Sequence, residues 1–182
     1  MTDNVNFSFG FPHLNNNNRE SFSEANSINS FNINHSNNTE PSDIFALAKA
    51  FLSLSSMTNK KLQKLCYYAK AWYLALYDEN LISEDFQAWV HGAVQPELYH
   101  HYKDYGFSSI PQIHDTANIP EVFLSFSKEI YDAYGHLTGD QLEELNHQES
   151  PWIIARGDCE PWETCTNIIS ETDMKSYYRS LL

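Results

Sequence analysis

The sequence is poor in basic residues and in glycine, and each shortage narrows the range of functions. Its 182 residues include 11 Lys and Arg against 24 Asp and Glu, which gives a formal net charge of −13. Non-specific binding to nucleic acid needs clustered Lys and Arg to neutralise phosphates, so this composition argues against it. The six glycines form no glycine-rich loop that could cradle a phosphate. The charge balance instead favours solubility and a basic partner.

Cysteines and long apolar runs are also scarce. The three cysteines, Cys66, Cys159 and Cys165, lack the spacing of about two to four residues that is typical of a zinc pair. Because Cys66 lies on the apolar side of a predicted helix, we expect free thiols in a reducing cytoplasm. No apolar run approaches the roughly 20 residues that cross a bilayer, and the N-terminus does not resemble a signal peptide. The sequence therefore predicts a cytoplasmic protein without a membrane contact.

Residues 1–42 differ in composition from the remainder of the chain. They hold 12 Asn and 7 Ser, with one basic and four acidic side chains. Such a segment buries too little apolar surface to offset the cost of ordering, which predicts a disordered Asn/Ser-rich tail over 1–42. Its five phenylalanines leave a second interpretation open, a short linear motif that docks on a partner or on the folded domain.

Residues 43–182 predict one mainly α-helical domain, a compact bundle of about six helices with a small β element near 81–90. Helical periodicity begins near residues 44, 57, 96, 120, 139 and 170. Thr138 and Gln141 form a capping-box pattern before the fifth helix, and Pro151 is expected to end it, with one further turn at 153–155.

The longest predicted helix, 57–77, is the element around which we expect the domain to be organised. Thr58 is placed to cap its first turn through the side-chain hydroxyl. Apolar residues recur at helical spacing along it, namely Leu62, Leu65, Ala69, Trp72, Tyr73 and Leu76. Each aromatic ring removes about 150–250 Å² from water when it is buried, so this helix needs neighbours around most of its circumference.

The sequence contains no residue pattern typical of catalysis or of metal binding. Its histidines have no H-E-x-x-H spacing, and no serine lies in a G-x-S-x-G elbow. We therefore expect no catalytic residue, no metal and no cofactor. An enzyme that uses His91, His147 and Arg156 is the minority alternative. A core with hydrogen-bonded imidazole and guanidinium groups explains these residues, and a binding pocket on one face is the other interpretation.

Four segments, in order, resemble the Panacea antitoxin domain of SocA-like and phage-associated proteins. The first is Thr58–Leu65 with Tyr67–Ala69 and Trp72–Leu74, and the second is Phe86–Pro96. Leu98–Tyr99 and Tyr102–Gly106 continue the second segment. The third runs from Leu137 through Leu145–Trp152 to Gly157, and the fourth comprises Ile169–Ser170 and Tyr177–Tyr178. The resemblance covers residues 43–182, which we interpret as a Panacea-like domain.

The resemblance implies an antitoxin that neutralises a co-encoded protein toxin, the product of an adjacent gene, by direct binding. The alternative is an adaptor that delivers the toxin to a ClpXP-type protease. Neither role needs a catalytic residue, nucleic acid or a membrane. The signature residues taken as candidates for partner binding are Thr58, Asn59, Lys61, Gln63, Lys64, Tyr67, Trp89, His91, Gly92, Pro96, Tyr99, His147, Trp152 and Arg156. Their polar members either face a partner or tie the start of the helix to His91, Gly92 and His147.

Overall fold

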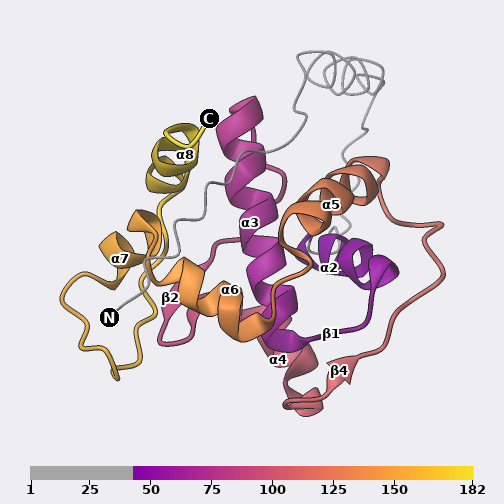
Figure 1. Cartoon of the computed structure of the whole chain (residues 1–182), viewed down its shortest axis with the longest axis horizontal. Helices are drawn as coiled ribbons and strands as arrows, with labels where there is room; N and C mark the ends of the chain where they lie inside the picture. The colour runs from indigo at the N-terminus through magenta and orange to yellow at the C-terminus, as the bar shows by residue number, and fades with distance from the viewer. Residues whose placement is uncertain (1–42) are drawn as a thin grey trace, which may run out of the picture. The chain divides into compact units, whose positions relative to one another are not determined.

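The structure, a computed structural model, describes residues 43–182, and the predicted tail at 1–42 lies outside the described residues. The described part contains seven α-helices and four short strands. In chain order the elements are α2 (Asp43–Leu54), β1 (Met57–Thr58), α3 (Asn59–Tyr77), β2 (Gln87–Trp89), β3 (Gly92–Val94), α4 (Pro96–Tyr102), the 3-10 helix η1 (Lys103–Tyr105), β4 (Ser109–Ile110), α5 (Glu121–Tyr134), α6 (Gly139–Asn146), α7 (Ser150–Arg156) and α8 (Glu171–Arg179). The prediction of a mainly helical fold is confirmed (Figure 1).

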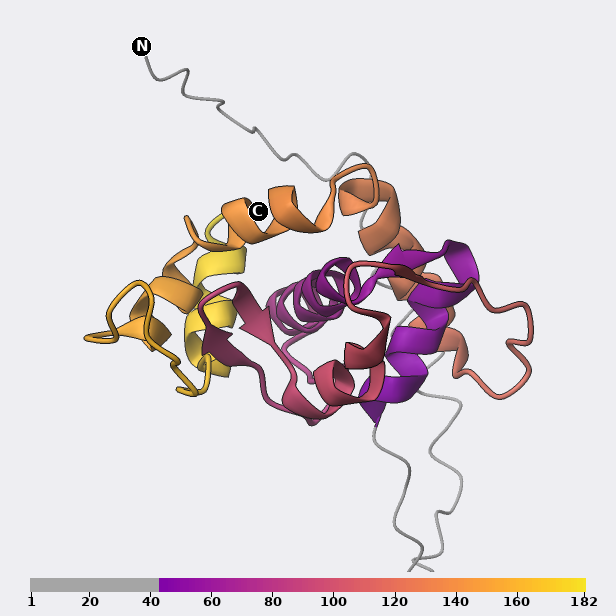
Figure 2. The same ribbon diagram turned by 90° about the horizontal axis from the view of Figure 1, so that it is seen from below.

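Helix α3 runs through the middle of the domain, and Figure 2 shows it nearly end-on with other elements around it. It contacts α2, α4, α5, α6, α8 and β3. Sixteen of its 19 residues are buried, including the polar Gln63, Lys64 and Lys70. The helix thus has neighbours around most of its circumference, as its aromatic content predicted, and its polar side chains must find partners inside the protein.

Local signals in the sequence fix where several helices begin. Thr58 caps α3 as predicted, since its Oγ1 accepts a hydrogen bond from Lys61 N at 3.3 Å. The capping box before α6 is also confirmed. Gln141 N donates to Thr138 Oγ1 at 3.2 Å, and Thr138 N donates to Gln141 Oε1 at 2.9 Å. Pro96 opens α4, whose first turn is capped by Gln95 Oε1.

The predicted β element near 81–90 is a hairpin that extends to residue 94. Strand β2 pairs antiparallel with β3, with Ala88 opposite Ala93. His91 lies in the turn between the strands, and Gly92 has a φ of +88° that favours glycine. A strand of three residues is too short to show an alternating pattern, which is why the sequence did not reveal β3.

The structure corrects two further expectations. Pro151 does not end a helix but stands in the first turn of α7, where its missing N–H leaves no hydrogen bond unmade. The break lies before it, at residues 147–149. Strands β1 and β4 form a second two-stranded sheet that no periodicity could indicate, with Met57 opposite Ile110.

Aromatic side chains join α3 to α5 and α8 in the core. Trp72 is 1% exposed, which confirms its predicted burial, and its Nε1 donates to Tyr134 Oη at 2.8 Å. The Tyr68 and Tyr134 rings stack with centroids 4.4 Å apart, and the Trp72 and Tyr178 rings meet edge-on at 5.0 Å.

Among residues 43–182, no helix combines the length and the apolar character needed to cross a membrane.

Candidate functional site

The polar signature residues at the start of α3 point toward the segment from β3 to α4. Lys64 Nζ donates to Ala93 O at 2.9 Å, and Gln63 Oε1 accepts from Gln95 N at 2.8 Å. Asn59 Nδ2 donates to Tyr99 O at 3.1 Å. All three side chains are buried. These three side chains therefore tie the start of α3 to the hairpin and to α4.

Asn146 and Glu149 complete this buried polar centre, which we define as Asn59, Gln63, Lys64, Asn146 and Glu149. Asn146 Oδ1 accepts from Ala93 N at 2.7 Å, while its Nδ2 donates to Glu149 Oε2 at 3.0 Å. Tyr178 Oη donates to the same carboxylate oxygen at 2.7 Å. Neither Asn146 nor Glu149 was among the candidate residues, although both lie in the third signature segment, where Asn146 ends α6 and Glu149 precedes α7.

Burial shifts the ionisation of both charged members of the buried polar centre. It lowers the pKa of Lys64 to about 7, because the ammonium has lost its hydration. It raises the pKa of Glu149 to about 7 for the same reason, against the hydrogen bonds from Asn146 and Tyr178. Burial also raises the pKa of the Tyr67 hydroxyl, and the Glu149 carboxylate adds to that rise. The centre thus holds groups that titrate near neutrality inside the fold.

Because Gly92 has no side chain, Lys64 and Asn146 of the buried polar centre can lie close to its backbone. A Cβ at this position would lie 2.7 Å from Lys64 Nζ and 2.8 Å from Asn146 Oδ1. The backbone there also has a positive φ. The signature glycine is therefore required both by the turn and by the close approach of the lysine.

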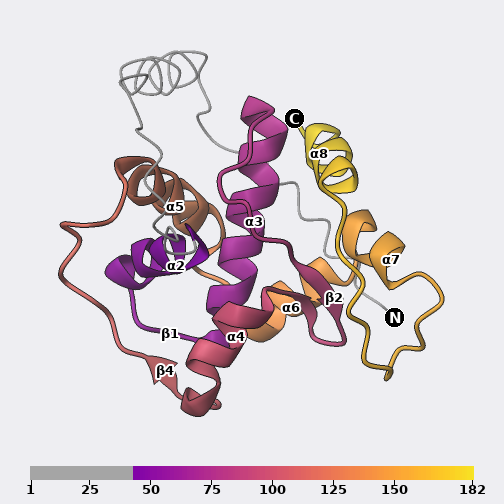
Figure 3. The same ribbon diagram turned by 180° about the vertical axis from the view of Figure 1, so that it is seen from behind.

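A second group of signature residues reaches the surface. The His147 and Trp152 rings lie 4.3 Å apart, Trp152 Nε1 donates to Trp89 O at 3.1 Å, and the Trp89 and Tyr99 rings meet at 5.1 Å. We call these four residues the aromatic row. Figure 3 shows α4 and β2 in front of α3, with α7 beside β2. Burial lowers the pKa of His147, which keeps its imidazole neutral at pH 7.

His91 lies at one end of a groove of about 400 Å³ between the hairpin turn and α6. Its Nδ1 is 2.9 Å from Glu143 Oε1. Lys60 Nζ pairs with Asp140 and with Glu143, each at 2.7 Å. Lys61 does not belong to this group of paired charges, because its Nζ donates to Gly135 O at 2.6 Å. The charges along this groove are therefore largely paired with one another.

Arg156 has a role that its sequence position did not reveal. Its guanidinium donates to Ala88 O at 3.4 Å, to Glu163 O at 3.0 Å and to Glu160 O. It also lies over the Trp152 ring, with Cζ 5.6 Å from the centroid. Because the Arg156 guanidinium donates to these backbone carbonyls, it holds the loop after α7 in place. It does not converge with His91 and His147. Residues 43–182 hold no group of three or more His, Cys, Asp or Glu arranged to bind a metal ion.

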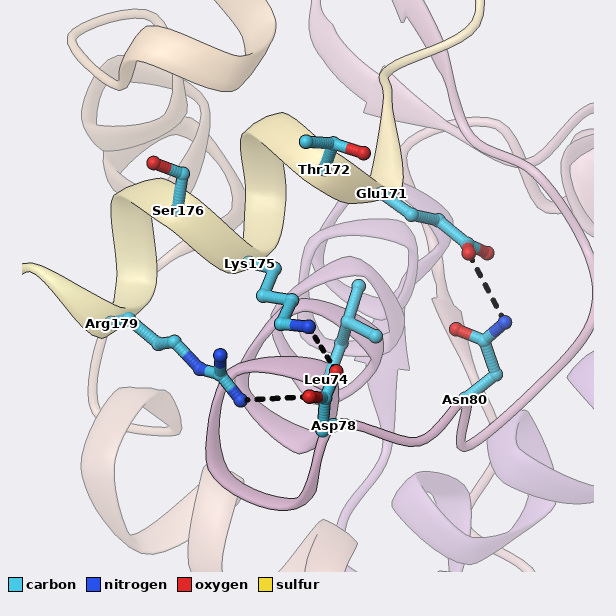
Figure 4. A pocket seen from close by; sticks show the side chains of 8 residues that line it. All are labelled: Leu74, Asp78, Asn80, Glu171, Thr172, Lys175, Ser176 and Arg179. Carbon is cyan, nitrogen blue, oxygen red and sulfur yellow. Dashed lines mark hydrogen bonds and ion pairs between the residues drawn. The ribbon is translucent and has the colours of Figure 1, made fainter.

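A hollow of about 670 Å³ lies where the C-terminal end of α3 meets α8 (Figure 4). Asp78 accepts hydrogen bonds from Lys175 and pairs with Arg179 at 3.5 Å. Glu171 pairs with the buried Lys70 at 2.8 Å and accepts from Asn80 at 3.1 Å. Each cation here already faces a carboxylate, so we interpret the hollow as the seam that fastens α8 to α3.

The fold and the site define a small, mainly helical domain in which a buried polar centre lies beside a partly exposed aromatic row. Its sequence matches the family model described as "Antitoxin SocA-like, Panacea domain" over residues 62–153, half of the chain. The chain belongs to this family, and the membership indicates an antitoxin-like role with a toxin as the kind of partner. No curated protein and no solved structure matches the chain.

Proposed function

We propose that this protein is an antitoxin that neutralises a co-encoded protein toxin in the cytoplasm by binding it directly. The observation that carries the proposal is the family match, which runs from the first turn of α3 into α7. That range contains most of the buried polar centre and the whole aromatic row. A role in binding agrees with Arg156, which is buried and donates to backbone carbonyls of the chain.

The surface charge supports a basic partner. Residues 43–182 carry 20 acidic and 10 basic side chains. Eight of the basic side chains are bonded to carboxylates or carbonyls of the chain itself, namely Lys60, Lys61, Lys64, Lys70, Lys128, Arg156, Lys175 and Arg179. Acidic side chains therefore outnumber basic ones and few cations are unpaired, which complements an enzyme whose own surface is basic because it handles RNA.

The aromatic row is where we place part of the toxin contact. Its members are signature residues that are exposed or half-buried, and aromatic side chains at the surface are typical anchors of protein interfaces. Tyr99 is 37% exposed, and its side chain is not part of the tie from Asn59, which uses the Tyr99 carbonyl. The Tyr99 ring can therefore be removed without opening the buried polar centre.

The direct test is co-expression with the product of the adjacent reading frame. We expect restored growth and a complex that co-purifies. Tyr99→Ala should weaken both effects, whereas Tyr105→Ala, which removes a ring of similar exposure (40%), should leave them unchanged. Persistent toxicity without a complex would contradict direct neutralisation.

The second candidate is the adaptor for a ClpXP-type protease, which the family resemblance also implies. It differs from the first in what happens to the toxin. Under direct binding the amount of toxin stays constant while its activity falls, whereas an adaptor shortens the half-life of the toxin. Immunoblotting of the toxin after protein synthesis is stopped separates the two roles.

A further inference from the structure

Exposed apolar side chains recur along α7 and the loop that follows it. Ile153 and Ile154 on α7 are exposed, Trp162 in the loop is 78% exposed, and Ile168 at the end of the loop is exposed as well. We call these four residues the α7 patch. Single exposed apolar residues are ordinary, but four large ones within one short segment are typical of an interaction surface. Ile153 is the last residue that the family model matches, and the other three lie beyond it.

The loop that carries Trp162 is held by several hydrogen bonds. The Arg156 guanidinium binds the carbonyls of Glu160 and Glu163. Asn167 Nδ2 donates to Ala155 O at 3.0 Å, and Ala88 N donates to Asn167 O at 2.9 Å. Figure 1 and Figure 3 both show this loop extending away from α3 at the edge of the domain. A loop fastened at both ends loses little further entropy when Trp162 is bound, which favours affinity.

Acidic side chains border the α7 patch. Asp158, Glu160 and Glu163 flank Trp162 in the sequence and are exposed. The nearby cation, Arg156, is buried. Phosphates of a nucleic acid would be repelled by this border, and a second copy of the chain would bring the same negative charge. A basic protein surface is the occupant that the charges favour.

We propose that the α7 patch docks a basic, pocket-bearing surface of the toxin, with Trp162 as the inserted side chain. This inference rests on the proposed function. It adds which surface of this protein binds the toxin and which chemistry the bound toxin surface has. Apolar contact by Trp162 supplies the affinity, because a large ring leaves water, and the acidic border orients the two proteins. The α7 patch and the aromatic row share helix α7, since Trp152 directly precedes Ile153 in it.

The test measures binding of the full-length protein to a catalytically inactivated form of the adjacent gene's product. Trp162→Ala should raise the dissociation constant at least about 30-fold, the loss typical of an interface anchor. Phe107→Ala, which removes another fully exposed ring, should leave it within about threefold of the wild type. Equal unfolding temperatures for the three proteins would show that the effect is not a loss of folding.

A second pair of variants tests the acidic border. Asp158→Asn combined with Glu160→Gln should weaken binding and flatten its dependence on salt, because charges that face the partner are removed. Glu79→Gln combined with Glu121→Gln removes the same charge elsewhere and should do neither. Identical salt dependence of both double variants would overturn the proposed docking surface.

The possible failures are distinguishable. If the wild type does not bind the inactivated toxin, the proposed function falls and the docking surface falls with it. If the wild type binds and Trp162→Ala binds equally well, only the docking surface is overturned. Sedimentation that shows a self-association abolished by Trp162→Ala would assign the α7 patch to a second copy of the chain and overturn the toxin assignment.

Discussion

Gly92 allows a lysine to enter the core of this protein. Because Gly92 has no side chain, Lys64 Nζ can reach the backbone of β3 and donate to Ala93 O. Asn146, at the end of α6, fills the other side of the same space and accepts from Ala93 N. A buried ammonium without such a carbonyl partner would be costly. The identities of Gly92 and Lys64 are thus coupled through one small volume.

Gly92→Ala should therefore be far more destabilising than its size implies. A left-handed backbone costs an ordinary residue about 1–2 kcal/mol, and a displaced polar group adds about 1–3 kcal/mol. Gly106→Ala is the matched control, because Gly106 has a φ of +54° but its added Cβ would meet nothing within 4 Å. Denaturant unfolding should show the larger loss for Gly92→Ala. Equal losses would mean that the turn alone, and not the buried polar centre, requires glycine.

Glu149 gives the stability of the domain a dependence on pH. Its pKa is raised from 4.5 to about 7 in the folded state. The folded state therefore holds a proton that the unfolded chain releases between pH 4.5 and 7, and this contribution to stability is lost as the pH rises through that window. Lys64 acts oppositely above pH 7, because its lowered pKa lets the folded state release a proton that the unfolded chain keeps.

Glu149→Gln should remove the part of the pH dependence of stability that lies between pH 4.5 and 7. From pH 5 to pH 8, the free energy of unfolding of the wild type should fall relative to that of the variant by about 2–3 kcal/mol, as a shift of this size implies. Urea unfolding at both pH values checks this. Glu144→Gln on α6, an exposed carboxylate, is the control and should run parallel to the wild type. A parallel course for Glu149→Gln as well would contradict the raised pKa.

At the scale of elements, α3 organises the domain because it is both aromatic and polar on its buried sides. The aromatic side packs against α5 and α8, and the polar side bonds to β3 and α4. Periodicity revealed the first of these sides and not the second. The polar side has the composition of a solvated face, and only contacts with distant segments show that it is buried.

Trp72→Ala should cost about 3–5 kcal/mol of stability, the range for a large buried side chain reduced to alanine. The loss includes the hydrogen bond from Trp72 Nε1 to Tyr134 Oη. Trp162→Ala, which truncates an exposed tryptophan, should change the free energy of unfolding by less than about 0.5 kcal/mol. Thermal and denaturant unfolding compare the two. A small effect at Trp72 would remove this side of α3 from the core.

The sequence predicted elements where the signal was local and missed them where it was not. Thr58, Pro96 and the capping box of Thr138 begin their helices through contacts within a few residues, and these starts were predicted correctly. Strands β1 and β4 are two residues each and exist through a pairing between distant segments. Asn146 and Glu149 were missed for the same reason, since their partners come from β3 and α8.

At the scale of the whole molecule, residues 43–182 contain the elements that build both the buried polar centre and the α7 patch. We therefore propose that they fold without residues 1–42. A protein truncated to 43–182 should show one cooperative thermal transition at the temperature of the full chain. Unfolding or aggregation of the truncated protein would show that the phenylalanines of the N-terminal segment support the domain.

The central claim is that binding alone silences the toxin, and a titration with purified proteins tests it most directly. The activity of the adjacent gene's product is measured as this protein is added, with no protease and no nucleotide for a protease present. Direct neutralisation predicts that activity falls to the background once the two proteins are equimolar, and that intact toxin is recovered from the complex. Undiminished activity in the presence of excess protein would contradict the account.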